Sequence, residues 1–396
     1  MRDSKIKVLL VSIVPPLNDC GVRIVMYRHL VERDPFDLHV VSNADFADDL
    51  LIDTKLKLPY LIERIRKSRF GPRFAKWIAD YQNLIWTLTI PKDLDKAIKS
   101  FKPHVILTLA ETNLCHIAAK SANKHKIPLA GLFLDWFPIM KGHFGHQWTR
   151  KLLSARYRKL YHQCDLAFCT SDGMQEVLGD HPNSHVIYPM PGRHDVPETF
   201  APPKTGKFRI VYVGSVQDFY GRMICSLIEA IEATDDLEII VVGPNADWPA
   251  DILNRAKERG IYLGFKPPAE AAEVLAGADV LLVVMSFEPE HRLFMETSFT
   301  TKFLDYSAYG KPMILWGPEY CTPVKVAKRE CAAMVVDSPN VIGLINSLRE
   351  INRNAELRSI LARKTTELHL GMFSSDRLQR VFVDQIERLV KKPTNQ

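Results

Sequence analysis

The stretch from residue 286 to residue 318 reads SFEPEHRLFMETSFTTKFLDYSAYGKPMILWGP, and it carries the clearest signal of the fold class. It follows the apolar run 279–285, continues through a helical pattern, and returns through Gly310, Lys311 and Pro312 to a second apolar run that ends at Trp316. Apolar strands separated by a helix are typical of a parallel sheet whose two faces are both covered. The stretch therefore predicts one strand-helix-strand unit of a doubly wound α/β domain.

The same alternation extends outward over the whole chain and divides it into two parts. Helical patterns separate apolar runs at 7–14, 38–42, 104–109, 129–134, 166–169 and 185–188, and then at 208–213, 237–242, 261–264, 279–285, 312–316 and 331–336. Between the two sets, residues 188–207 hold five prolines and no hydrophobic periodicity, which is typical of a linker. We expect two doubly wound, Rossmann-like α/β domains at 1–188 and 208–396, a linker at 189–207, and a last helix that is a candidate to return to the first domain.

Length and composition agree with two ordinary globular domains. The chain has 396 residues, of which 46% are hydrophobic and 25% are charged, close to the globular average. Seven cysteines without a Cys-x-x-Cys pair argue against a disulfide framework and a structural zinc site. The apolar run 8–14 is too short for a signal peptide, and no later run approaches the length of a transmembrane helix. We therefore expect a cytoplasmic protein.

Charge is distributed unevenly along the chain. The formal net charge is +6, but residues 1–200 hold 28 Lys and Arg against 21 Asp and Glu, whereas residues 201–396 are slightly acidic. The excess is concentrated in 55–76, where eight basic residues accompany one acid, Glu63, and lie among apolar side chains such as Phe74 and the following Trp77. Such a segment can bind the anionic inner leaflet of the plasma membrane, or it can be a helix with a solvated basic face. Nucleic acid is disfavoured, because the second half is acidic and no nucleic-acid motif is present.

Polar residues follow the predicted strand 279–285, at the edge where open parallel sheets bind ligands. Neither a Gly-x-Gly-x-x-Gly nor a Walker-type motif is present, which disfavours a dehydrogenase and a P-loop enzyme. Instead, Thr300 and Thr301 precede a predicted helix, and Lys302 adds a positive charge. Such a helix start can bind a phosphate, and Asp305 can accept a hydrogen bond from a sugar hydroxyl. A capped helix with a solvated lysine is the alternative interpretation.

The first domain offers candidate ligand contacts of its own. Gly21, at a helix start, can leave backbone N–H groups open to an anion, although a plain turn explains it equally well. Asp135 ends an apolar strand, where it can contact a ligand hydroxyl or can cap a turn, and Glu111 has a similar position. His143 and His146 look like a metal pair, but no third ligand is near in sequence, and we predict no metal.

Taken together, these motifs resemble a known family. FLDYSAYGKPMIL is similar to the segment of retaining, family 4 glycosyltransferases in which an acidic residue on a helix is followed by small residues and Gly-x-Pro before a strand. The same family is matched by PPLNDCG, YVGS, VVGPNAD, GIYLGFKPPAEAAEVLAGADVLLV, LDWFP and CDLAFCTSDGM, so the resemblance covers nearly the whole chain. It implies the GT-B fold, in which two Rossmann-like domains face a central cleft, with the acceptor on the first domain and the donor on the second.

The resemblance also implies roles for acidic positions in the second domain. Asp305 matches the second of the family's two acidic residues, which holds the nucleotide ribose, while Thr297 occupies the position of the first. Glu288 and Glu296 have the family's spacing, with seven residues between them, but they lie nine residues too early. All of Thr297, Glu288 and Glu296 are therefore candidate contacts to the donor sugar.

In the family, a basic pair neutralises the donor diphosphate, but this chain has Ser215 and Tyr220 at those positions. Lys302, Arg222 or Arg292 must then supply the charge, and Lys302 is the first choice because it lies in the hydroxyl-rich helix start. The remaining residues that the resemblance places at the donor are Thr300, Thr301, Gly214 and Gly243.

The implied function is a hexosyltransferase that retains anomeric configuration and takes its sugar from a UDP- or GDP-linked donor, with no further cofactor. Asp135 and Lys302 are the predicted catalytic residues, with Lys302 stabilising the departing diphosphate. Because the segment 55–76 is suited to a membrane surface, we expect a lipid-linked or cell-surface glycan precursor as acceptor, and a role in polysaccharide biosynthesis. A nucleotide-sugar epimerase of the same fold and a non-catalytic sugar-nucleotide-binding protein are the alternatives.

Overall fold

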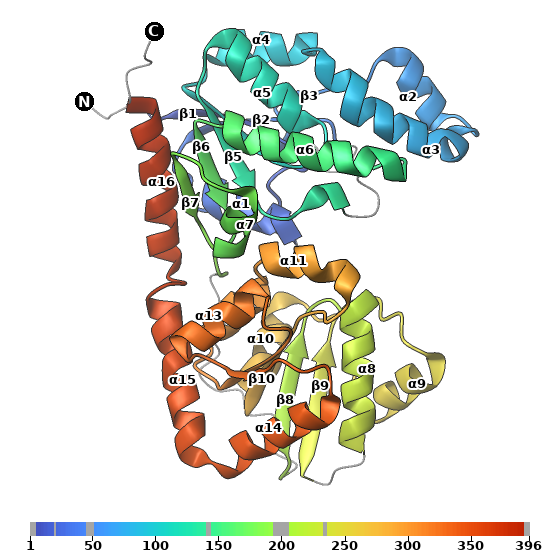
Figure 1. The fold of residues 1–396 in the computed structure, drawn as a ribbon, viewed down its shortest axis with the longest axis vertical. Coiled ribbons are helices and arrows are strands. Elements are labelled where there is room, and N and C mark those ends of the chain that lie inside the picture. Colours follow the sequence, from blue (N-terminus) through green and yellow to red (C-terminus); the bar gives the residue numbers. More distant parts are fainter. Residues whose placement is uncertain are drawn as a thin grey trace. The chain divides into compact units, whose positions relative to one another are not determined.

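A computed structural model describes residues 5–19, 21–44, 51–139, 144–192, 206–232 and 236–391 (Figure 1). The chain divides into two compact units, one formed by Met1–Tyr188 together with Leu378–Gln396 and the other by Pro189–Arg377. Most of the predicted linker lies outside the described residues, as does His143. Each unit is built on its own parallel sheet.

The first unit contains a seven-stranded sheet with the order β3-β2-β1-β4-β5-β6-β7. Every pairing in it is parallel. The central strands are buried on both faces, as their continuous apolar runs predict. Strand order reverses between β1 and β4, which creates a switch point of the kind where such sheets bind ligands. The strands are β1 (Lys7–Val11), β2 (Asp37–Ser42), β3 (Thr54–Lys55), β4 (Val105–Leu109), β5 (Leu129–Phe133), β6 (Leu166–Cys169) and β7 (Ser184–Val186).

Helices connect these strands, and their ends follow from local sequence. Ser171 caps α7, because its hydroxyl accepts a hydrogen bond from the backbone N–H of Met174. Lys102 and Lys126 end α4 and α5 in the left-handed region, with φ of 51° and 53°. The helices of this part are α1 (Gly21–Leu30), α2 (Tyr60–Lys67), α3 (Gly71–Asp80), α4 (Lys92–Phe101), α5 (Leu114–His125), α6 (Gln147–Gln163) and α7 (Asp172–Leu178).

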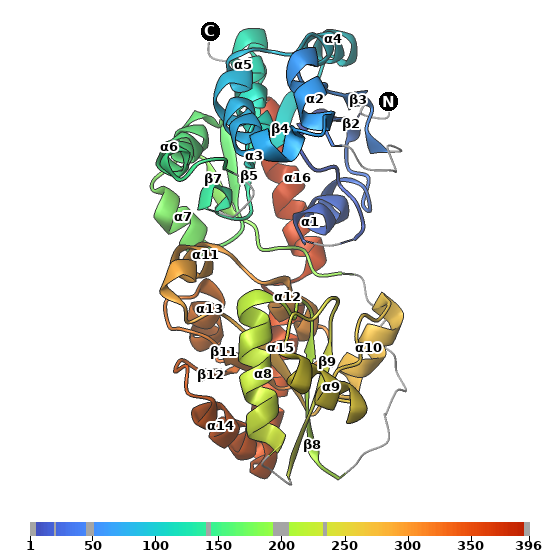
Figure 2. The same ribbon diagram turned by 90° about the vertical axis from the view of Figure 1, so that its right-hand side faces the viewer.

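The last helix, α16 (Ser375–Lys391), packs against the first unit although it comes from the other end of the chain (Figures 1 and 2). The ring of Phe382 lies 4.7 Å from His29 of α1, 6.1 Å from Phe36 and 5.0 Å from Phe168 of β6, measured between centroids. Gln379 adds two hydrogen bonds to His29, one to its ring and one to its carbonyl. Phe382 is 1% exposed, so its removal would leave a cavity in the core of the first unit.

The second unit contains a five-stranded parallel sheet with the order β12-β11-β10-β8-β9. Here the order reverses at β8, which lies between β10 and β9. The predicted strand at 261–264 is wrong, because only Tyr262 makes an isolated bridge, to Val241, and Gly260 and Gly264 bracket the run with φ of 69°. The strands are β8 (Phe208–Val213), β9 (Leu237–Val242), β10 (Val280–Val284), β11 (Met313–Trp316) and β12 (Met334–Val336).

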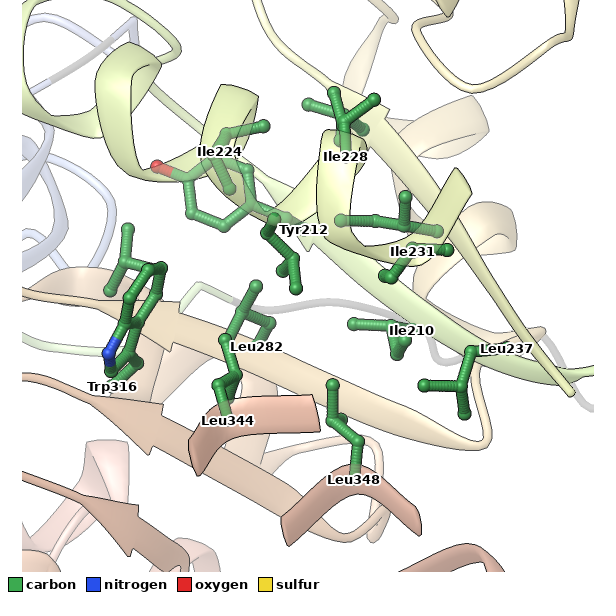
Figure 3. Packing of buried hydrophobic residues seen from close by; sticks show 14 of the residues in the cluster. Ile210, Tyr212, Ile224, Ile228, Ile231, Leu237, Leu282, Trp316, Leu344 and Leu348 are labelled. Carbon is green, nitrogen blue, oxygen red and sulfur yellow. The ribbon is translucent and has the colours of Figure 1, made fainter. Parts of the chain in front are cut away.

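Helices α8 and α14 bury apolar faces on one side of this sheet (Figure 3). Ile224 and Ile228 of α8 and Leu344 of α14 meet Tyr212 of β8 and Leu282 of β10 in one core cluster. This packing holds the ends of β8 and β10 in fixed positions, and those ends carry the candidate site. The helices are α8 (Asp218–Glu232), α9 (Ala250–Glu258), α10 (Pro268–Ala276), α11 (Arg292–Thr297), α12 (Thr301–Ser307), α13 (Thr322–Glu330), α14 (Val341–Arg353) and α15 (Ala355–Leu370).

Candidate functional site

Lys302 of α12 and Gly214, the residue that follows β8, are brought together at the switch point of the second sheet. A Cβ atom added to Gly214 would lie 2.1 Å from Cε of Lys302 and 3.0 Å from its Nζ. Gly214 also has φ of 148°, a backbone conformation that side chains rarely adopt. The lysine stem therefore fills space that only a glycine leaves open. Two residues that the sequence predicts at the donor are in contact.

The ammonium group of Lys302 lies over two aromatic rings. Its Nζ is 4.3 Å from the ring centroid of Tyr220 and 5.4 Å from that of Tyr212. The quadrupoles of these rings attract a cation and hold it in place. Burial lowers the pKa of Lys302 to about 8, and the negative charge of Asp305 opposes that shift. The side chain is thus still mostly protonated at neutral pH, and it forms a poorly hydrated positive charge.

Tyr306 fastens α12 to the end of β8. Its hydroxyl donates to the carbonyl of Val213 at 2.9 Å and accepts from the N–H of Val213 at 2.8 Å. Tyr306 is buried, so both bonds are protected from water. Because Val213 directly precedes Gly214, these bonds fix the distance between Lys302 and the strand end. The sequence alone did not single out Tyr306 or Tyr212, and it marked Tyr220 only as a position where the family has a basic residue.

Asp305 lies one turn after Lys302 on the same short helix. Its Oδ1 accepts a hydrogen bond from the backbone N–H of Gly192 at 3.1 Å. Thr300 precedes α12 at its N-cap, as predicted, while Thr301 is the first residue of the helix, and no hydroxyl cap joins Thr300 to the helix within the described residues. The predicted contacts of Asp305, Thr300 and Thr301 to the donor stay predictions.

Gly243, which follows β9, packs against the Gly214 loop. A Cβ on Gly243 would lie 2.1 Å from the carbonyl oxygen of Gly214. The N–H of Gly243 donates to the carbonyl of Gly264 at 2.9 Å, and its own carbonyl accepts from the hydroxyl of Tyr262 at 2.8 Å. The glycine thus lets two strand-end loops approach each other closely, and this packing accounts for it without a ligand.

Arg222 and Glu288 bind each other. Nε and Nη2 of Arg222 lie 2.9 and 2.5 Å from Oε1 of Glu288, and Oε2 of Glu288 lies 3.3 Å from Nδ1 of His291. The carboxylate neutralises the guanidinium, so Arg222 offers less charge to a phosphate than Lys302 does. Both residues were predicted at the donor, but their pairing was not.

The other predicted sugar contacts also have partners within the second unit. Arg292 pairs with Glu296 at 2.8 Å, and its guanidinium lies 4.8 Å from the ring centroid of Tyr320. Thr297 is fully buried, and its hydroxyl donates to the carbonyl of Leu293 at 2.8 Å. The Thr297 hydroxyl thus bonds to the backbone of its own helix, α11, and this bond was not predicted from the sequence. Contacts of Glu296 and Thr297 with a donor sugar, and of Arg292 with its diphosphate, stay predictions.

In the first unit, Gly21 begins α1 with φ of 56°, and a Cβ there would have no described atom within 4 Å. The backbone conformation of Gly21, rather than crowding, requires a glycine.

His146 bonds through Nδ1 to Oδ2 of Asp80 at 2.5 Å. Within the described ranges, no group of three or more His, Cys, Asp or Glu side chains is arranged to hold a metal ion.

Glu111 and Asp135 lie at the ends of the neighbouring strands β4 and β5. Each is the second residue after its strand. Glu111 is 5% exposed, and burial, together with the negative charge of Asp135, raises its pKa to about 7. A carboxyl group with such a pKa can exchange a proton near neutral pH. Both residues were candidate ligand contacts in the sequence, but their proximity was not predicted, although their matching positions after two successive strands were a usable signal.

The surroundings of Asp135 hold its backbone in place. Its carbonyl accepts hydrogen bonds from the buried hydroxyl of Tyr157 at 2.9 Å and from the N–H of Phe137 at 3.0 Å. The guanidinium of Arg158 lies 4.9 Å from the ring centroid of Trp136. These contacts fix the backbone of Asp135, whose half-buried carboxylate can accept hydrogen bonds from hydroxyl groups.

Two parallel, doubly wound sheets with alternating helices form the GT-B fold, so the predicted fold class is confirmed. HepE of Anabaena in complex with UDP aligns with 97% of this chain and 100% of its own, with a TM-score of 0.63 and 12% identity. A glycosyltransferase from Rickettsia africae aligns over 98% and 100%, with a TM-score of 0.66 and 14% identity. A Listeria monocytogenes protein assigned as a UDP-N-acetylglucosamine 2-epimerase aligns over 97% and 98%, with a TM-score of 0.57 and 14% identity.

By sequence, no protein-family model matches the chain, and no curated protein matches it. The likeness to the solved structures is one of fold, because at 12 to 14% identity side chains at corresponding positions are mostly different. A function must therefore be argued from the site itself.

Proposed function

We propose that this protein is a glycosyltransferase, and that its second unit binds the diphosphate of a nucleotide-sugar donor at Lys302. The observation that carries the proposal is the position of this cation, which lies at the switch point of the sheet, against Gly214 and over the ring of Tyr220. Ligands of open parallel sheets bind at such points. HepE, which has the same fold, is known in complexes with UDP and with UDP-glucose.

The chemistry of sugar transfer explains why one well-placed cation matters. When the bond from the sugar to the diphosphate breaks, negative charge develops on the departing phosphate oxygen. A charge-assisted hydrogen bond from Lys302 stabilises that charge, and the loss of water around a half-buried ammonium strengthens it. In this scheme Asp305 holds the ribose, and the backbone N–H groups at Thr300 and Thr301 add donors to the phosphates.

The first unit takes the acceptor in this scheme. Asp135 and Glu111 accept hydrogen bonds from acceptor hydroxyl groups, and Asp135 acts in turnover rather than in donor binding. We further propose transfer of a hexose with retention of configuration, and a lipid-linked glycan precursor as acceptor, because the first unit carries the basic excess around 55–76.

An epimerase of the same fold is the second candidate, and the acidic pair favours it. Epimerisation needs groups that add and remove protons, and Glu111 has a pKa of about 7. The Listeria structure shows that a protein assigned to this class has a similar fold. The two candidates differ in their products. An epimerase converts UDP-N-acetylglucosamine without an acceptor, whereas a transferase releases UDP only as an acceptor is glycosylated.

A panel of nucleotide sugars tests the proposal. A UDP- or GDP-linked sugar at about a hundredfold excess over its Kd should stabilise the folded protein by roughly 2.7 kcal/mol, seen as a higher melting temperature. Lys302→Met, which keeps the apolar stem, should lose most of that stabilisation, while Lys257→Met on the exposed face of α9 should keep it. If no nucleotide raises the melting temperature of the folded protein, the proposal fails. A non-catalytic binding protein would show the shift but no turnover.

A further inference from the structure

The hairpin of α2 and α3 exposes more apolar surface than its position in the first unit requires. None of the residues of α2 is buried, and residues 72–77 of α3 are all exposed. Figure 1 shows the two helices on the side of the first unit away from α16. Tyr60 is 79% exposed, Leu61 64% and Trp77 61%. Monomeric soluble proteins rarely leave so many large apolar side chains in one region without a binding function.

The N-terminal part of α6 extends this apolar surface. The ring of Trp77 lies 4.5 Å from that of His146, which directly precedes α6, and Asp80 of α3 accepts from the hydroxyl of Thr149 at 3.0 Å. Trp148 and Leu152, one helical turn apart on α6, are 62% and 45% exposed. We call the exposed surface of α2, α3 and the first half of α6 the α2–α3–α6 face.

Positive charge surrounds these apolar side chains, and little of it is neutralised. Arg66 and Lys67 both pair with Glu63. These two partners hold the pKa of Glu63 well below its usual range, and the hydrogen bond from Arg66 is the larger cause. The exposed Arg64 and Arg73 form no ion pair with any described residue. Two more exposed cations on this face are Lys76 and Lys151, and Arg69 is exposed in the turn between α2 and α3.

This combination points to one kind of partner. We propose that the α2–α3–α6 face docks onto a lipid bilayer with anionic headgroups, with its aromatic side chains at the headgroup level and its cations on the lipid phosphates. Tryptophan and tyrosine favour that interface, and basic amphipathic helices bind it through buried apolar area and charge together. Within the described part of the chain, no helix is long and apolar enough to span a bilayer.

The proposal goes beyond the glycosyltransferase activity and does not depend on it. The sequence predicted a basic segment at 55–76, whereas the structure adds Trp148 and Leu152 of α6 and places Arg66 and Lys67 in ion pairs with Glu63. In this proposal the α2–α3 hairpin and α6 both contact the bilayer. The charges on α2 and α3 and the aromatic side chains on α3 and α6 should therefore contribute separately to membrane binding.

Vesicle co-sedimentation of the full chain tests the proposal. The protein should pellet with vesicles of phosphatidylcholine and phosphatidylglycerol but not with phosphatidylcholine alone, and raised salt should release it because charges are screened over about 8 to 10 Å. Replacing Arg64, Arg69 and Arg73 by Ser should weaken partitioning on the order of a hundredfold, since each basic residue near the surface contributes about 1 kcal/mol. The matched control replaces the exposed Lys96, Lys257 and Arg353 by Ser and should bind as the wild type does.

The aromatic contribution has its own test. Trp77→Ser with Trp148→Ser should weaken binding and remove most of the blue shift in tryptophan fluorescence that vesicles cause. Both side chains are exposed, so melting temperatures should stay close to the wild type. Equal binding to neutral and anionic vesicles would overturn the proposal, as would equal losses in the two triple variants. Retention on single-stranded DNA but not on vesicles would assign the face to nucleic acid instead. Nucleotide-induced stabilisation is measured without vesicles, so its failure is distinguishable from failure here.

Discussion

The two units share one architecture but present opposite charges at the ends of their strands. In the first unit, β4 and β5 end at the carboxyl groups of Glu111 and Asp135, while in the second, β8 ends beside the ammonium of Lys302. Burial shifts the pKa of Glu111 upward to about 7 and that of Lys302 downward to about 8, so the same cause brings both toward neutrality. The sheets supply positions, whereas the side chains decide which chemistry each position performs. An acid pair suits hydroxyl groups and protons, and a cation suits a phosphate.

The largest expected effect is a loss of stability that is confined to the first unit. Phe382→Ala should destabilise the first unit by about 3 to 5 kcal/mol, because a fully buried ring that contacts His29 and Phe168 is lost. Hydrogen exchange should show faster exchange of the amides of β1 and β6, with β8 and β9 little changed. Arg380→Ala, at an exposed position of the same helix, is the control. Equal loss of protection in both sheets would contradict the prediction that Phe382 stabilises the first unit alone.

The second prediction concerns pH and Glu111. The folded protein keeps the proton of Glu111 up to about pH 7, whereas an unfolded chain loses it near pH 4.5. The unfolded state therefore binds fewer protons in this window, and stability falls as pH rises through it. Relative to Glu111→Gln, the wild type should lose roughly 3 kcal/mol of unfolding free energy across the window. The difference isolates Glu111 from groups such as His29, and a difference that is constant with pH would contradict the prediction.

Gly214→Ala should disturb the cation of the second unit without removing it. The new methyl group would collide with the stem of Lys302, and the positive φ adds a backbone cost, together about 1 to 3 kcal/mol. Affinity for UDP should fall at least several-fold. Gly260→Ala is a matched control, because Gly260 has φ of 69° and open space around its Cβ position. If calorimetry finds unchanged UDP affinity in the Gly214 variant, Lys302 does not bind the phosphate from this position.

Asp135→Asn should have the smallest effect on binding. Removal of its charge should lower the pKa of Glu111 only in part, because burial is the larger cause of that shift. UDP affinity should stay within about twofold, since the residue belongs to the first unit, while turnover should fall. Infrared titration of the Glu111 carboxyl and steady-state kinetics measure the two effects. A large loss of UDP affinity would contradict the assignment of Asp135 to turnover rather than to donor binding.

Much of the fold could be predicted because buried parallel strands appear as apolar runs. The run that became β10 is one example, and all five of its residues are buried. The run at 261–264 failed because its glycines turn the chain, and the two-residue β3 was missed because it is too short to leave a pattern. Helix α11 was missed because its six residues show no clear periodicity.

The site was less predictable because its contacts depend on tertiary structure. Its place in a hydroxyl-rich helix start singled out Lys302, but only the structure shows that Gly214 makes room for it and that Tyr220 lies beneath it. Likewise, nothing in the sequence shows that Arg222 is neutralised by Glu288. Spacing along a chain cannot reveal contacts between residues that are distant in sequence.

Calorimetric titration of Lys302→Met with UDP and with uridine tests the central claim most directly. If Lys302 binds the diphosphate, the variant should bind UDP more weakly than the wild type by roughly 1.5 to 3 kcal/mol, about 10- to 150-fold, because a charged hydrogen bond is lost. Binding of uridine, which carries no phosphate, should be the same in both proteins. Unchanged UDP affinity, or equal losses for UDP and uridine, would contradict the claim that Lys302 provides the phosphate-binding charge of the second unit.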